Sequence, residues 1–77
     1  MRDNDGYWSG TLQRTDTGRW SIGENYEITS GERFELHIDG EWELVRMEFS
    51  HSIGGYYTIP DRPLRHGMKA RQGWYGK

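Results

Sequence analysis

The sequence has no cysteine, two prolines and no long hydrophobic run among its 77 residues. Without cysteine the chain cannot form disulfides, use a thiol nucleophile or hold a metal through sulfur. No apolar segment approaches the roughly 18 residues that span a membrane, and the acidic, polar first residues do not resemble a secretory signal. A small domain without disulfides is typical of a reducing compartment. We therefore expect a soluble, cytoplasmic protein that does not contact membranes.

Aliphatic residues are also scarce, since the chain contains one alanine, one valine and four leucines. This is too little material for the apolar stripes of a helix bundle. Aromatic residues take their place, with four Trp, five Tyr and two Phe. Each buried ring can remove ~150–250 Å² from water, so about half of them suffice to build a small core. The rings near the two ends, Tyr7, Trp8, Trp74 and Tyr75, are not required for that core and are candidates for function.

Short stretches of alternating apolar and polar residues, separated by the 11 glycines, indicate an all-β protein. The clearest is a hairpin, in which Phe34, Leu36 and Ile38 alternate with charged residues before the turn at Asp39-Gly40. The first strand of this hairpin covers residues 32–38, and further strands are expected over residues 10–14, 19–22, 26–28, 41–49, 56–59 and 68–71, with 26–28 either a strand or an extended connection.

The register of this hairpin follows from its loop length. A three-residue loop with a glycine bulge places Leu36 opposite Trp42 and Phe34 opposite Leu44, whereas a two-residue loop places glutamates opposite Leu36 and Ile38. We predict the longer loop because it keeps apolar residues on one face. The predicted core aromatics are Trp20, Phe34, Trp42 and one of Tyr56 and Tyr57, and Glu35 and Glu43 share the solvent face. A second bulge near residues 44–45, or burial on both faces there, then accommodates the odd-numbered apolar positions that follow.

The expected fold is a single, partly open, antiparallel SH3-like barrel of five or six strands over residues 6–72. A short 3₁₀ turn is expected near residues 63–67, with a disordered N-terminus over 1–5 and a flexible tail over 73–77. An OB-like barrel and a meandering sheet are the alternatives.

Several segments resemble one group of proteins. They are Gly10-Thr11-Leu12, Arg19-Trp20-Ser21-Ile22, Ser30-Gly31-Glu32-Arg33-Phe34, Gly40-Glu41-Trp42, Arg46-Met47-Glu48, Tyr56-Tyr57 and the run from Leu64 to Arg71. Over residues 10–71 the chain is similar to a family of small β-rich proteins of unknown function from Gram-positive bacteria and their phages and mobile elements. Ser30 stands where members often have cysteine, which disfavours a thiol or metal role there. The resemblance implies a β-rich fold and a phage or mobile-element context, and no particular chemistry.

Charge is unevenly distributed along the chain. Residues 1–60 carry 5 Arg against 11 Asp and Glu, whereas residues 61–77 carry five cations against one acid. The basic segment either binds a polyanion or neutralises the acidic part of the fold, and close pairing of the two would weaken the case for nucleic acid. The candidate binding surface comprises Tyr56, Tyr57, Arg62, Arg65, Lys69, Arg71, Trp74 and Tyr75.

The sequence contains no pattern typical of catalysis. His37, His51 and His66 lack the close spacing of metal ligands, and nucleophile-elbow, P-loop and dinucleotide motifs are missing. Paired carboxylates could serve a glycosidase only around a cleft that so small a barrel has little room for. Arg46 and Glu48 share one strand face and are expected to form a structural ion pair. We predict no enzyme activity, no cofactor and no metal.

These observations favour a non-catalytic binding module, a protein-interaction domain of phage or mobile-element origin. One alternative is a nucleic-acid-binding barrel that uses the basic segment 61–71. Another is a phage-type inhibitor that blocks a host nucleic-acid-binding enzyme through its acidic hairpin. Self-association through the terminal aromatics is a further expectation.

Overall fold

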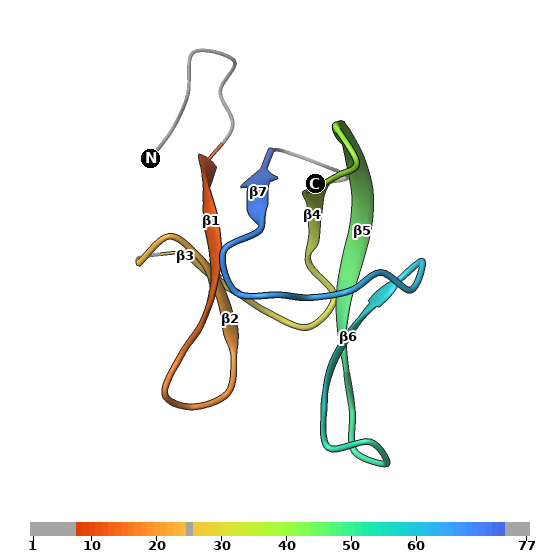
Figure 1. The fold of residues 1–77 in the computed structure, drawn as a ribbon. Helices are drawn as coiled ribbons and strands as arrows, with labels where there is room; N and C mark the ends of the chain where they lie inside the picture. Colours follow the sequence, from red (N-terminus) through yellow and green to blue (C-terminus); the bar gives the residue numbers. More distant parts are fainter. Residues whose placement is uncertain (1–7, 25, 74–77) are drawn as a thin grey trace.

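The computed structural model describes residues 8–24 and 26–73 and consists of strands and turns. The strands are β1 (Trp8–Arg14), β2 (Trp20–Ile22), β3 (Tyr26–Ile28), β4 (Arg33–Ile38), β5 (Glu41–Ser50), β6 (Gly55–Ile59) and β7 (Lys69–Gln72). They form one antiparallel sheet, ordered β3-β2-β1-β7-β4-β5-β6, which curls into a half-barrel (Figure 1). The all-β prediction is confirmed, but the described strands number seven rather than five or six because both short segments, β2 and β3, pair. No helix in the described residues is long and apolar enough to cross a membrane.

The β4–β5 hairpin turns over two residues, so the predicted three-residue loop is wrong. Ile38 pairs directly with Glu41, and the turn residues Asp39 and Gly40 have φ angles of 51° and 82°. Positive φ at both positions defines the type I′ turn, whose twist matches that of the flanking strands and for which Asp-Gly is a favoured sequence. The backbone preference of this dipeptide therefore outweighs the matching of apolar residues across the strands.

This register sends residues 41–44 of β5 to the faces opposite to those expected. Val45 lies inside opposite Phe34, whereas Trp42 lies on the outer face opposite His37, so the prediction of Trp42 in the core is wrong. Glu35 and Glu43 do not share a face either, because Glu35 is on the outer face and Glu43 on the inner. The pairing runs unbroken past residues 44–45, and no bulge is needed there.

The core lies on the inner face of the curled sheet and draws on β1 to β5 and β7. Its buried residues are Leu12, Trp20, Ile22, Ile28, Phe34, Leu36, Val45, Met47 and Ala70. Trp8, one of the end aromatics, also packs there: its ring lies 6.0 Å from that of Tyr26, and its Nε1 donates to the Ile22 carbonyl at 3.4 Å. Trp8 is thus a structural residue rather than a free aromatic.

A strap formed by residues 60–68 connects β6 to β7 and crosses the open side of the half-barrel (Figure 1). Leu64 and Met68 pack against the core. The expected 3₁₀ turn is absent from residues 63–67, and a single turn closes instead through the Met68 N–H and the Arg65 carbonyl at 3.3 Å. Gly67, with a φ of 92°, cannot continue a 3₁₀ helix.

The start of the strap is held by one buried hydroxyl. Thr58 is 1% exposed, and its Oγ1 donates to the Pro60 carbonyl at 2.8 Å and accepts from the Arg62 N–H at 2.8 Å. The strap therefore leaves β6 in a defined direction, which places residues 61–64 beside the sheet.

The type I′ turn makes a first prediction. Gly40→Ala forces a Cβ into the left-handed region and should lower the free energy of unfolding by about 1–2 kcal/mol. Gly55→Ala is the matched control, because Gly55 has no positive φ and open space at its Cβ position. Urea unfolding of the two variants measures the difference, and equal losses would contradict the turn assignment.

The strap anchor makes a second prediction. Thr58→Val keeps the shape of the side chain but leaves the Arg62 N–H and the Pro60 carbonyl without their partner, at a cost of about 1–3 kcal/mol in unfolding free energy. Thr11→Val, at an exposed position of β1, should change stability by less than ~0.5 kcal/mol. Thermal and urea unfolding check both values, and a stable Thr58→Val protein would exclude the anchoring role.

Candidate functional site

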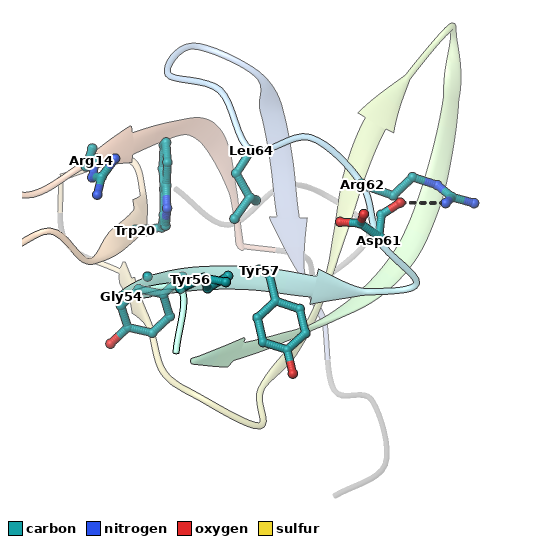
Figure 2. A pocket seen from close by; sticks show the side chains of 10 residues that line it. Arg14, Trp20, Gly54, Tyr56, Tyr57, Asp61, Arg62 and Leu64 are labelled. Carbon is teal, nitrogen blue, oxygen red and sulfur yellow. Dashed lines mark hydrogen bonds between the residues drawn. The ribbon is translucent and has the colours of Figure 1, made fainter. Parts of the chain in front are cut away.

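A groove of about 400 Å³ lies between the β1–β2 hairpin, the start of β6 and the strap (Figure 2). Its walls come from three parts of the chain that are distant in sequence. The lining residues are Arg14, Trp20, Ile53, Gly54, Gly55, Tyr56, Tyr57, Asp61, Arg62 and Leu64. This is the size of a small-ligand or side-chain pocket, and its lining mixes aromatic, aliphatic and charged groups.

The β1–β2 hairpin supplies one wall. Arg14 pairs directly with Trp20, so both side chains lie on the same face at the turn end of the hairpin. The turn between them is closed by the Thr15 N–H, which donates to the Arg19 carbonyl at 2.8 Å. The Arg14 guanidinium carbon lies 5.6 Å from the centre of the Trp20 ring, within the range of a cation–π contact. Trp20 is 7% exposed and therefore contributes a rigid edge to the groove.

Strand β6 supplies the second wall and separates the two tyrosines. Tyr56 pairs with Phe49 on the inner face, and the two rings meet edge-on at 5.0 Å. Tyr57 pairs with Glu48 on the outer face, and its ring points away from Trp20 and Leu64 in Figure 2. Both tyrosines line the groove, and their rings project from opposite faces of β6.

The β5–β6 hairpin extends beyond the body of the half-barrel (Figure 1). Ile53 and Gly54 at its turn line the groove. Its tip exposes two large apolar side chains, Phe49 at 40% and Ile53 at 69%. His51 packs edge-on against Phe49 at 5.0 Å. Phe49 near the tip thus contacts Tyr56, which lines the groove together with Ile53.

The basic segment lies beside the acidic hairpin rather than apart from it. Arg62 forms an ion pair with Glu43 on the inner side, and Arg71 forms one with Glu35 on the outer side. The Arg71 guanidinium also lies 4.1 Å above the Trp42 ring, whose other neighbour is the His37 ring at 4.9 Å. Two of the four cations in residues 61–71 are thus engaged within the fold.

The structure divides the candidate surface that the sequence suggested. Tyr56, Tyr57 and Arg62 meet in the groove, whereas Arg71 lies on the outer face of β7. Arg65 and Lys69 are exposed and make no ion pair with the described residues. The remaining two candidates, Trp74 and Tyr75, lie outside the described residues.

Sequence reasoning missed most of the groove. Arg14, Ile53, Asp61 and Leu64 were not expected to act together, and Trp20 was expected only in the core. The opposition of Arg14 and Trp20 was accessible from the sequence, because the Asp16-Thr17-Gly18 turn defines that hairpin. The position of the strap beside the groove could not be predicted from the sequence, since it depends on contacts between segments that are distant along the chain.

Arg46 and Glu48 form an ion pair on the outer face, with Nε and Oε2 2.8 Å apart. The two side chains are 45% and 26% exposed, so the pair is a surface contact worth about 0–1 kcal/mol and not a buried, specifying interaction.

One hydroxyl–carboxylate contact has a marked electrostatic effect. The Tyr26 hydroxyl donates to the Glu32 carboxylate, which also accepts from the Thr29 N–H at 3.0 Å. Burial, together with the hydrogen bond and charge of Glu32, raises the pKa of Tyr26 well above its usual range. The hydroxyl thus stays protonated and ties β3 to the start of β4. The described part of the chain holds no group of three or more His, Asp or Glu side chains that could bind a metal ion.

Comparison with known proteins places these features in a family. No curated protein and no solved structure matches the chain. A family model described as "Domain of unknown function (DUF5348)" matches residues 10–72, a stretch that includes every strand from β2 to β7 and most of β1. The matched stretch covers the hairpin walls, the strap and the core, so the chain belongs to the DUF5348 family.

Proposed function

We propose that this protein is a non-catalytic protein-interaction domain whose partner docks in the groove and against the tip of the β5–β6 hairpin. The observation that carries the proposal is the group of large apolar side chains at the groove and the neighbouring hairpin tip, which are Trp20, Tyr56, Leu64, Phe49 and Ile53. Ile53 is 69% exposed and Phe49 is 40% exposed, and large apolar side chains grouped at a surface are typical of interaction sites.

The composition of the groove suits a protein partner. Tyr, Trp and Arg dominate binding hot spots because they bury large areas and add polar contacts. Trp20 and Tyr56 are held by the core and by Phe49, so little side-chain entropy is lost when a partner packs against them. Arg14 and Asp61, at different edges of the groove, offer one charge of each sign to orient that partner.

The pairing of charges supports a protein partner over nucleic acid. Arg62 and Arg71 are bound to Glu43 and Glu35, which leaves only Arg65 and Lys69 of residues 61–71 to track phosphates. Nucleic-acid affinity depends on several such cations. The same two pairs neutralise Glu43 and Glu35 of the acidic hairpin, so imitation of phosphates by that hairpin is also less favoured.

Three finer expectations accompany the proposal. The curled antiparallel sheet supports an SH3-like relationship, and the absence of cysteine supports a cytoplasmic location. A phage or mobile-element origin is supported by the resemblance of residues 10–71 to proteins of that setting.

Peptides selected from a random display library on the immobilised protein test the proposal. Tyr56→Ala should weaken their binding by about tenfold or more, because it removes an aromatic wall of the groove. Tyr57→Ala is the comparison variant and should weaken binding less, since its ring projects from the opposite face of the same strand. Calorimetry measures the affinities, and Ile53→Ser, at an exposed position, gives a second variant that leaves the core intact. Equal affinities across these proteins, or no selected peptides, would contradict the proposal.

Gel retardation with single-stranded DNA at low salt tests the nucleic-acid alternative. We expect no complex. A complex that weakens with salt and is lost in the Arg65→Gln, Lys69→Gln double variant would favour that alternative instead.

A further inference from the structure

A second surface lies on the outer face of β4, β5 and β6, away from the groove. Arg33, Arg46 and Ile59 occupy one row across these three strands, with Arg33 directly opposite Arg46 and Arg46 directly opposite Ile59. Directly opposed residues on one sheet face have Cβ atoms about 4.5–5.5 Å apart, and like charges in this position destabilise a sheet. The direct opposition of Arg33 and Arg46 therefore lowers the stability of the fold rather than contributing to it.

The row borders a shallow depression of about 260 Å³. Leu44 and Ile59 line it and are 46% and 43% exposed, and Pro60 lies at its rim. Two aliphatic side chains thus form an open apolar floor beside the two adjacent arginines.

The charge at this surface is positive. Arg46 contacts Glu48 through Nε, and a guanidinium carries further N–H donors on its two terminal nitrogens. Arg33 is exposed and forms no ion pair with the described residues. The neighbouring Glu35 forms its ion pair with Arg71 and therefore does not neutralise the charge of Arg33.

We propose that this depression, which we name the arginine site, docks an acidic segment of a partner protein in which a Glu or Asp lies next to an aliphatic residue. The carboxylate accepts hydrogen bonds from Arg33 and Arg46, a geometry that guanidinium groups favour. The aliphatic side chain packs on Leu44 and Ile59. The bound carboxylate also reduces the repulsion between the two arginines, and this reduction adds to the free energy of binding.

The proposal predicts that Arg33 is needed for binding but not for the stability of the fold. A structural role for Arg33 would make its loss destabilising. A binding role predicts the reverse, because Arg33→Gln removes a like-charge contact and should leave the melting temperature equal to or above that of the unaltered protein, with any gain shrinking as salt is added.

Titration of the ¹⁵N-labelled protein with the tripeptide N-acetyl-Leu-Glu-Leu-amide tests the site. Saturable shifts are expected at the amides of Leu44, Arg46 and Ile59. The Glu-to-Gln version of the tripeptide, and the Arg33→Gln protein, should each bind about fivefold more weakly or worse, since each removes one partner of a charge-assisted hydrogen bond. Arg19→Gln, which alters an exposed arginine on the β1–β2 hairpin, should bind as the unaltered protein does.

Three results would overturn the arginine site: no saturable shift at these amides, equal affinity of the Glu and Gln tripeptides, or a fall in melting temperature in Arg33→Gln. The Tyr56→Ala protein should bind the tripeptide normally. Failure at the groove and failure at the arginine site are therefore distinguishable.

Discussion

The two-residue turn at Asp39-Gly40 is the constraint on which the rest of the structure depends. Side chains along a strand alternate between faces, so a slip of one residue in the β4–β5 register would move every side chain of one strand to the other face. With the observed turn, Val45 meets Phe34 inside. Trp42 then lies on the outer face, where the Arg71 guanidinium packs over its ring. Glu43 lies on the inner face, where it forms an ion pair with Arg62.

The two ion pairs give the uneven charge of the chain a structural role. Arg62 and Arg71 come from the basic segment, and Glu43 and Glu35 from the acidic hairpin. The Arg71–Glu35 pair is the more enclosed, with side chains 19% and 15% exposed, and it connects the neighbouring strands β7 and β4. Breaking one partner of such a pair costs more than the pair itself contributes, because it leaves a partly buried charge alone.

Local patterns predicted the strands well and their arrangement poorly. Alternation located β4 and β6 within a residue of their observed bounds, because it reflects burial on one face. The hairpin register was wrong because the sequence pattern weighs apolar matching, whereas the turn obeys the φ preferences of Asp39 and Gly40. Tyr56 was among the predicted site residues, but its neighbours Arg14 and Leu64 were not, since their approach depends on the path of the strap.

Strand β7 lies between β1 and β4, although it is the last strand described. Without it, β1–β2–β3 and β4–β5–β6 are two separate three-stranded sheets, each with an open edge where β7 belongs. During synthesis from the N-terminus, both sheets leave the ribosome before the strand that joins them. The nascent chain therefore carries two unpaired edges, at β1 and β4, until residues 69–72 emerge.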